Sequence, residues 1–245
     1  MTELIFVCGL LAVLLLLFSI LIHRIKHDKS HLLKHVVITG GSSGIGLAVA
    51  QQIVKLSKKQ PQNTEDASLM KRRITLIARG LPNLKQAKEL LEKEAAIGPS
   101  GSSSSIEIRI VSLDVADDAK VQSVLKSEFD DVAPTMLFNV AGTSISGYVE
   151  STPSEMYEKM MRINYMGTVN VTRACLPYLR RSGKGGAIAF TSSAAGQVGV
   201  FGYTAYSPSK FALSGFVEAL NMEISPDRIS TTIAFPPDTD TPGKC

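Results

Sequence analysis

A tyrosine and a lysine four residues apart, Tyr206 and Lys210, are the pair in this sequence with the clearest capacity for chemistry. Residues at this spacing share one face of a helix. A free tyrosine has a pKa of about 10, and a neighbouring ammonium group favours the phenolate and lowers that pKa. Tyr206 could then give a proton to a carbonyl oxygen while a hydride arrives at the carbonyl carbon. The spacing is common on helices, so it does not establish an active site by itself.

Further polar residues at the ends of predicted elements support this pair. Ser192 and Ser193 end a strand predicted over Gly186–Ser192, at the carboxyl edge where ligands bind in parallel sheets. Asn139 ends another predicted strand, and Asn164 lies in a helical segment. Together these side chains favour the catalytic interpretation of the tyrosine and the lysine.

A glycine-rich turn gives a second chemical signal. The run TGGSSGIG, from Thr39 to Gly46, follows a predicted strand and precedes a predicted helix. Glycine permits positive φ angles and a close approach of the backbone to a pyrophosphate. A helix N-terminus supplies free N–H groups and a positive dipole end for the anion. The candidates for contact with a dinucleotide are Gly40, Ser42, Ser43, Gly44, Ile45 and Gly46.

The residue that follows the second predicted strand indicates which dinucleotide would bind. Arg79 stands where an NAD-binding protein of this kind tends to carry an acid for the ribose 2′-hydroxyl. A cation suits a 2′-phosphate instead, and Ser42 and Ser43 can add hydroxyl donors. The sequence therefore favours NADPH/NADP as the cofactor. The alternative is that Arg79 is an ordinary surface charge.

Alternating strands and helices must position these groups. Strands are predicted over His35–Thr39, Ile74–Ala78, Ile106–Leu113, Thr135–Val140, Gly186–Ser192 and Ile229–Phe235. Helices are predicted over Gly44–Ser57, Pro82–Ala96, Asp117–Phe129, Pro153–Arg181 (one helix or two) and Ala205–Ile224. Such alternation forms parallel βαβ units with right-handed crossovers. The predicted fold class is α/β, with a doubly wound parallel sheet.

Two polar stretches between these elements are expected to be surface loops. Ser57–Arg73 is charged and lies between the first helix and the second strand. Gly98–Ser105 has the composition of a flexible loop before the third strand. Neither stretch implies a function.

The first residues differ in composition from the rest of the chain. Leu4–Ile22 is apolar apart from Ser19, and a helix of these 19 residues would be about 28 Å long, close to the thickness of a bilayer core. Glu3 precedes the run and no small-residue cleavage site follows it, which argues against a cleaved signal peptide. The basic residues that follow are Arg24, Lys26, Lys29 and Lys34.

This charge asymmetry places the main domain in the cytosol by the positive-inside rule. We therefore expect a membrane anchor over residues 1–23, a juxtamembrane linker over 24–34 and one folded domain over 35–245. The helix of the anchor would precede the sheet as a single transmembrane span.

Charge, histidines and cysteines argue against other classes of function. The net charge of +4 is weak and patchy, so no nucleic-acid partner is expected. His23, His27, His31 and His35 recur every four residues, but His35 begins a predicted strand, so contact with lipid headgroups is favoured over a metal site. The three cysteines fit no metal spacing and no disulfide framework, which indicates a reducing compartment.

Taken in order, the motifs resemble those of a known family. TGGSSGIG, NVAG, the serine pair and YSPSK are similar in order and spacing to the short-chain dehydrogenase/reductases, over about Leu33 to Gly243. The resemblance implies a Rossmann-like fold and a Ser–Tyr–Lys mechanism with a supporting asparagine.

The resemblance also implies a role for each catalytic candidate. Tyr206 would be the proton donor, and Lys210 would lower the pKa of Tyr206 and hold the nicotinamide ribose. Ser193 best matches the serine that hydrogen-bonds the substrate carbonyl, with the adjacent Ser192 as the alternative. Asn164 would hold a water that links Lys210 to solvent.

Further cofactor contacts are implied in the same way. Asp114 matches the position near the adenine ring, and Asn139 matches the motif that braces the central strand. Pro236 and Thr239 belong to the run PPDTDTPG, which would close over the nicotinamide.

Two segments carry a closer resemblance, to the 3-ketodihydrosphingosine reductases. These segments are GQVGVFGYTAY, which ends at Tyr206, and FPPDTDTPG, which begins at Phe235. The resemblance implies NADPH-dependent reduction of a long-chain lipid ketone, 3-ketosphinganine, in sphingolipid synthesis. It also implies a place on the endoplasmic reticulum membrane with the domain facing the cytosol. A homodimer is one expectation for the assembly, and a steroid or retinoid carbonyl is the alternative substrate.

The sequence departs from the family pattern at its end. The chain stops at Cys245, just after PPDTDTPG, where family members continue with a further helix and strand. We therefore expect the last predicted strand to form an edge of the sheet. An inactive, truncated isoform is the alternative to an active enzyme.

Overall fold

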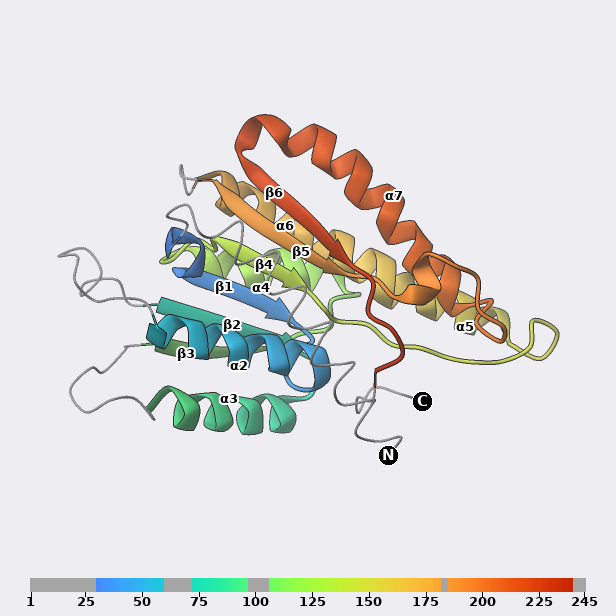
Figure 1. Cartoon of the computed structure of the whole chain (residues 1–245), viewed down its shortest axis with the longest axis horizontal. Helices are drawn as coiled ribbons and strands as arrows, with labels where there is room; N and C mark the ends of the chain where they lie inside the picture. The colour runs from blue at the N-terminus through green and yellow to red at the C-terminus, as the bar shows by residue number, and fades with distance from the viewer. Residues whose placement is uncertain (1–29, 60–71, 97–105, 182–184, 240–245) are drawn as a thin grey trace.

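Runs rich in β-branched and apolar residues form one parallel sheet of six strands. The strands are β1 (His35–Thr39), β2 (Arg72–Ala78), β3 (Ile106–Ser112), β4 (Met136–Asn139), β5 (Gly186–Thr191) and β6 (Ile229–Ala234). They lie in the order β3-β2-β1-β4-β5-β6, and all neighbouring pairs are parallel. The computed structural model describes residues 30–59, 72–96, 106–181 and 185–239 (Figure 1).

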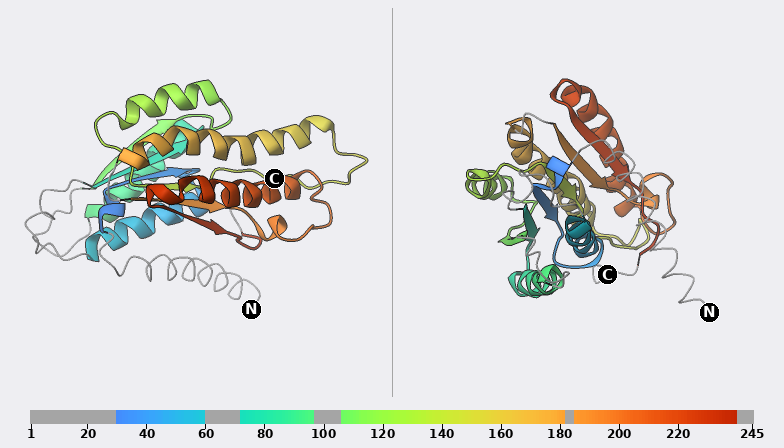
Figure 2. Two further views of the ribbon diagram at one scale, coloured as in Figure 1. Left: turned by 90° about the horizontal axis from the view of Figure 1, so that it is seen from above. Right: turned by 60° about the vertical axis from the view of Figure 1, so that its left-hand side comes forward.

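Helices cover both faces of this sheet. They are α2 (Gly44–Lys59), α3 (Leu81–Ala96), α4 (Asp118–Phe129), α5 (Ser154–Met160), α6 (Gly167–Arg181) and α7 (Tyr206–Ile224). α2 and α3 pack on one face, and α4, α6 and α7 pack on the other (Figure 1, Figure 2). The predicted α/β fold with a doubly wound parallel sheet is confirmed.

Side chains that alternate along each strand contribute to two separate hydrophobic cores, one on each face of the sheet. The core beneath α4, α6 and α7 takes Val37, Ile77, Val111, Leu137 and Ile188 from the sheet. The core beneath α2 and α3 takes Val36, Ile38, Ile74, Leu76, Ile108 and Met136. Because both faces of the central strands are buried, these strands are nearly continuous apolar runs in the sequence.

The strand order reverses between β1 and β4. From β1 the chain crosses to β2 and β3 on one side, whereas β4, β5 and β6 extend the sheet on the other. A crevice forms at the carboxyl ends of the strands on either side of such a reversal. The fold therefore brings the glycine-rich turn after β1 beside the residues that follow β4.

Two expected boundaries are wrong. Leu32 and Leu33, assigned to the juxtamembrane linker, lie in a short 3₁₀ turn (Ser30–Leu33) and are buried in the α2–α3 core, so the folded domain begins before residue 35. Ser57, predicted both as the last residue of the first helix and as the first residue of a surface loop, is buried in α2, whereas Arg73, expected in the same loop, is buried in β2. Arg73 is held there by ion pairs with Asp131 and Glu107. Residues 60–71 of that loop and Gly98–Ser105 lie outside the described residues.

The helical stretch predicted as one or two helices is a single run with a change of pitch. Between α5 and α6, Met161–Met166 forms a turn of π-helix. Pro153 precedes the first helical residue, and Pro177 lies inside α6. Short π-helical turns are frequent at functional sites, because they re-aim side chains on an otherwise regular helix.

The anchor predicted over residues 1–23 lies outside the described residues. Across the ranges that the structure does describe, no helix is both long and apolar enough to cross a bilayer. Those same ranges contain no cluster of three potential metal ligands. His35 begins β1, as expected, and Cys175 is a buried residue of α6, where burial raises the pKa of its thiol.

A buried histidine lies at the amino edge of the sheet. His35 is fully buried; its Nδ1 donates to the Val132 carbonyl at 2.8 Å, and its Nε2 lies 2.9 Å from the Thr75 hydroxyl, which can donate to it. Its ring meets Phe129 edge to face at 5.7 Å. Burial is the main cause that lowers the pKa of His35 from 6.5 to about 4, and the nearby Arg73 lowers it further. The imidazole is therefore neutral in the folded protein at neutral pH.

This lowered pKa makes stability depend on pH. Below about pH 6.5, His35 binds a proton in the unfolded chain but not in the folded chain. The free energy of unfolding therefore falls as the pH drops towards about 4. We expect this residue alone to account for a loss of about 2 kcal/mol between about pH 7 and pH 5. Urea titrations of the wild type and of His35→Gln should show a stability gap that narrows by that amount. A gap that stays constant over this range would contradict the assignment.

Candidate active site

Two adjoining clefts lie at the carboxyl edge of the sheet, over the reversal between β1 and β4. The first has a volume of about 670 Å³ and the second about 390 Å³. Ile45, Val140 and Gly142 line both of them. The turn after β1 and the segment after β4 therefore form the shared wall, and a ligand in one cleft would reach the other.

The glycine-rich turn forms one side of the first cleft, and two of its glycines are required by the geometry. Gly40 has a φ of +67°, and a Cβ there would lie 3.0 Å from the Ala141 backbone. A Cβ at Gly46 would overlap the carbonyl group of Gly40. The turn is thus packed against the β4 segment and against the start of α2. All six predicted residues of the turn, Gly40, Ser42, Ser43, Gly44, Ile45 and Gly46, line the cleft.

The opposite wall carries the predicted charged residues. Arg79 lies at the end of β2, exposed, and lines the first cleft together with Gly80 and Asn83. Asp114, just after β3, lines the same cleft. The Ser112 hydroxyl donates to the Arg79 carbonyl at 2.9 Å, which ties the ends of β2 and β3 together. A nucleotide with its phosphates on the N-terminus of α2 would extend towards these residues.

Asn139 does not line either cleft. Its side chain is buried, and its Nδ2 donates to the Thr172 hydroxyl of α6 at 3.0 Å. Of its two predicted parts, contact with a cofactor and support of the central strand, only the second agrees with this position. The residue expected as a ligand contact instead joins β4 to the helix behind it.

The predicted tyrosine and serine meet in the second cleft. Tyr206 begins α7, and Ser193, which follows β5, lies close enough to Tyr206 to act on the pKa of the phenol. Both residues line the cleft. Ser192 lines it too, but its hydroxyl is buried and donates to the Lys210 carbonyl at 3.0 Å. Adjacent residues of an extended chain point in opposite directions, so only Ser193 faces the tyrosine.

The predicted lysine lies deeper, behind the tyrosine. Lys210 is buried, and its Nζ donates to the Thr191 carbonyl at 3.0 Å. The ammonium is 5.9 Å from the centre of the Tyr206 ring. Burial lowers the pKa of Lys210 from 10.5 to about 8, which leaves the side chain mainly protonated at neutral pH. Lys210 thus places a positive charge at the floor of the cleft.

The surroundings of Tyr206 raise its pKa from the ordinary value of 10. Burial of the phenol is the main cause, and it outweighs the effect of Ser193, which acts in the opposite direction. The lysine ammonium is directed at a backbone carbonyl rather than at the phenol oxygen. In this arrangement Tyr206 keeps its proton at neutral pH.

Asn164 lies on the π-helical turn and braces the loop after β4. Its Oδ1 accepts from the Thr143 amide at 2.8 Å, and its Nδ2 donates to the Thr143 carbonyl and to the Ser209 hydroxyl, both at 2.9 Å. A Cβ at Gly142 would lie 3.1 Å from Asn164 Oδ1 and 3.3 Å from Lys210 Nζ. The asparagine is therefore beside the lysine, although it lines neither cleft.

The segment after β6 closes one side of the second cleft. Pro236 and Thr239, both predicted, line it, as does Asp238 between them. The Ala194 amide donates to the Pro236 carbonyl at 2.9 Å, which fixes this segment to the serine that faces Tyr206. β6 is the edge strand of the sheet among the described residues.

Several residues of the site were missed from the sequence. Thr39, at the end of β1, accepts from the amides of Val140 and Ala141 at 2.9 and 3.0 Å. Tyr203 lines the second cleft, and its ring lies 5.4 Å from that of Tyr206. Asp238 also lies there. All three are within motifs that had been recognised, but their spacing gave no sign of which side chains face inwards.

A family model described as short chain dehydrogenase matches residues 34–244. The sequence is 45% identical over 211 residues to 3-dehydrosphinganine reductase of Danio rerio and 42% identical over 211 residues to 3-ketodihydrosphingosine reductase of Mus musculus. Each match covers 85% of this chain and 57% of the relative. The chain thus spans little more than half the length of these curated relatives.

The fold also resembles solved structures. L-sorbose reductase from Gluconobacter frateurii, complexed with NADPH and L-sorbose, is 27% identical, with a TM-score of 0.66 over 80% of this chain and 65% of that one. Levodione reductase is 22% identical with a TM-score of 0.71, over 85% of this chain and 73% of that one, and this second likeness concerns the fold alone.

Proposed function

The chain belongs to the short-chain dehydrogenase family, and we propose that it reduces the 3-keto group of 3-ketosphinganine to dihydrosphingosine with NADPH. The observation that carries this proposal is the meeting of Ser193, Tyr206 and Lys210 beside a cleft built for a dinucleotide. The reaction and substrate are supported by the names of the relatives at 42% and 45% identity. The bound NADPH of L-sorbose reductase, at 27% identity, supports the cofactor.

The residues of the first cleft suit NADPH. We assign the pyrophosphate to the N-terminus of α2 and the turn before it, where the geometry admits only glycine at positions 40 and 46. Arg79 would bind the 2′-phosphate, and Asp114 would lie near the adenine. Lys210, Pro236 and Thr239 would surround the nicotinamide end, in the second cleft. When bound, NADPH supplies the hydride.

The second cleft then supplies the proton. The Ser193 and Tyr206 hydroxyls would both donate to the ketone oxygen, which fixes the carbonyl carbon for attack. As negative charge develops on that oxygen, Tyr206 transfers its proton to it and the alcohol forms. The raised pKa of Tyr206 keeps the phenol protonated until then. The Lys210 ammonium stabilises the phenolate that remains, and Asn164 holds the surrounding loop in place.

The function can be tested with membranes from cells that produce the chain. With NADPH and 3-ketosphinganine, dihydrosphingosine should form. Tyr206→Phe should reduce kcat by at least about 100-fold, the usual contribution of a general acid, while NADPH still binds. Turnover of a steroid or retinoid ketone but not of 3-ketosphinganine would show that the substrate is that other lipid ketone. Cofactor binding without turnover of any ketone would refute the proposed activity.

The serine pair provides a matched comparison. Ser193→Ala should lower kcat by about 100-fold, because it removes a donor to the reacting oxygen. Ser192→Ala should instead lower the free energy of unfolding by about 1 kcal/mol, since it removes a buried hydrogen bond to the Lys210 carbonyl. Steady-state kinetics and thermal unfolding of both variants distinguish the two roles. The reverse pattern would assign the catalytic role to Ser192.

The cofactor preference depends on Arg79. Arg79→Glu should raise the Kd for NADPH by about tenfold or more, because a charge-assisted bond to the 2′-phosphate is replaced by repulsion. The Kd for NADH should change little. Lys85→Glu, at an exposed position of α3 that lines neither cleft, provides the control for the change in net charge. Equal losses for both dinucleotides in Arg79→Glu would show that the side chain does not recognise the phosphate.

We also propose that the domain is held at the endoplasmic reticulum membrane and meets its lipid substrate there. The apolar run Leu4–Ile22 would be the anchor. An exposed apolar rim supports this proposal. It consists of Tyr148, Val149, Val198, Val200 and Phe201, from two loops joined by the Gly147 amide and the Gly202 carbonyl at 2.8 Å.

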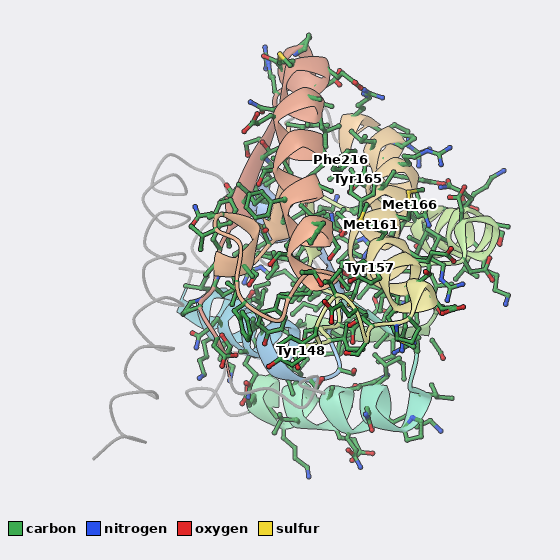
Figure 3. The ribbon with its side chains drawn as sticks, turned by 90° about the vertical axis from the view of Figure 1, so that its right-hand side faces the viewer. Tyr148, Tyr157, Met161, Tyr165, Met166 and Phe216 are labelled. Carbon is green, nitrogen blue, oxygen red and sulfur yellow. The ribbon has the colours of Figure 1, made fainter. Side chains whose placement is uncertain are left out.

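The rim lies at the mouth of the second cleft. Val200, which is part of the rim, also lines that cleft, and Phe201, 85% exposed, packs against Tyr148 at 5.6 Å. Figure 3 looks onto this edge of the sheet and shows Tyr148 on its loop, below the labelled side chains of the α5–α6 run and of Phe216 on α7. Large apolar side chains exposed at a cleft mouth suit contact with acyl chains, as at other lipid-binding surfaces.

The double variant Tyr148→Ser/Phe201→Ser should bind vesicles more weakly and reduce vesicle-borne 3-ketosphinganine more slowly, by about tenfold, because about 300 Å² of aromatic surface would no longer enter the lipid. Activity on a short, water-soluble ketone should be unchanged. Met222→Ser, 75% exposed near the end of α7, is the matched control. Equal losses on both substrates would mean that the rim shapes the cleft rather than binds lipid.

A further inference from the structure

The second cleft contains a single acidic side chain among its described lining residues, Asp238. It follows β6 in the segment that bears Pro236 and Thr239. Lys210 is the one cationic side chain in the same lining, and its ammonium is bound to the Thr191 carbonyl. The two charges therefore lie in the walls of one small cleft, with the lysine at its floor and the aspartate at an exposed position.

Backbone hydrogen bonds fix Asp238 relative to the reacting groups. The Ser192 amide donates to the Ala234 carbonyl at 2.8 Å, and the Ala194 amide donates to the Pro236 carbonyl at 2.9 Å. These bonds lie on either side of Ser193, the serine that faces Tyr206. Thr239 adds a local bond, from its hydroxyl to the Pro237 carbonyl at 2.8 Å. The segment with the aspartate is thus held against the segment that would bind the ketone.

The charge of Asp238 also acts on the catalytic phenol. Its negative charge contributes to the raised pKa of Tyr206, alongside burial, which is the larger cause. Asp238 and Tyr206 both line the second cleft, so the carboxylate and the proton donor belong to the same pocket.

The proposed substrate carries the complementary charge. 3-Ketosphinganine has an ammonium group on the carbon next to its carbonyl carbon, so the two polar groups enter a site together. With the ketone oxygen on Ser193 and Tyr206, the ammonium would lie on the wall of this cleft. A buried cation without a partner is costly, and Lys210 would repel it.

We propose that Asp238 forms a subsite for the ammonium group of the substrate and makes the enzyme selective for 2-amino ketones. This inference depends on the proposed reaction and adds to it a residue that determines specificity. The carboxylate orients the substrate by pairing with its amine, so that the ketone oxygen meets Ser193 and Tyr206 in one pose. An N-acylated or deaminated ketone lacks the charge and loses this orientation.

The test compares two ketones on three variants. The ketones are 3-ketosphinganine and its deaminated analogue, which has the same chain, hydroxyl and keto group. In the wild type, kcat/KM should be about fivefold higher for the amine, as expected for a partly exposed charge pair. Asp238→Asn should remove that preference by lowering kcat/KM for the amine alone. Asp238→Glu should restore part of it, and Glu150→Gln, in the exposed loop before α5, should leave it intact.

The result that overturns the proposal is a ratio of the two kcat/KM values that is the same in the wild type and Asp238→Asn. If neither ketone is reduced, the proposed reaction is wrong. The subsite is then tested by ligand binding alone. Dihydrosphingosine should then raise the Tm of the wild type more than the matched long-chain diol without nitrogen does. The difference should vanish in Asp238→Asn. Equal shifts in the wild type would show that Asp238 does not recognise an amine.

Discussion

The close contact between the ends of β1 and β4 is the constraint on which the rest of the site depends. The Thr39 hydroxyl accepts from two successive amides after β4, so the two strands end in register at the point where the strand order reverses. Gly40 then turns away with a positive φ, against the Ala141 backbone. Any wider junction would separate the shared wall of the two clefts. A larger side chain at position 40 would have the same effect, which makes this glycine a requirement of the fold before it is a requirement of binding.

In the second cleft, the residues of the lining are held in place by a residue outside it, Asn164. The π-helical turn places Asn164 where one amide group binds both the loop after β4 and Ser209 on α7. This bond network holds α7 at a fixed distance from the sheet, with Tyr206 on its first turn and Lys210 one turn later. The lysine reaches past the tyrosine to the end of β5. Tyr206 is thus positioned by Asn164 and Ser209, neither of which lines a cleft.

The sequence predicts the order of the strands and helices along the chain, but not the direction in which individual side chains point. The alternation of strands and helices predicted every strand of the sheet, and the position of Arg79 after the second strand predicted the wall of the first cleft. Ser192 and Ser193 could not be separated, because neighbours on an extended chain face opposite sides and the sequence does not show which side is the cleft. The local sequence pattern places Leu32 and Leu33 in a linker. Their burial depends on a tertiary contact, which that pattern does not show. The local sequence does not indicate a role for Asp238 either, because the hydrogen bonds between the ends of β5 and β6 are what place it in the same cleft as Tyr206.

The charges of the second cleft bear on the protonation state of Tyr206. Burial is the main cause that raises the pKa of Tyr206, and the charge of Asp238 makes a smaller contribution in the same direction, so the phenol is protonated at neutral pH and can donate to a ketone oxygen. Lys210, with its pKa lowered to about 8, remains largely cationic and stabilises the phenolate only once the proton has left. A substrate ammonium paired with Asp238 would cancel the carboxylate charge beside the phenol. The phenol would then release its proton more readily when the correct substrate is bound than when the cleft holds a neutral ketone.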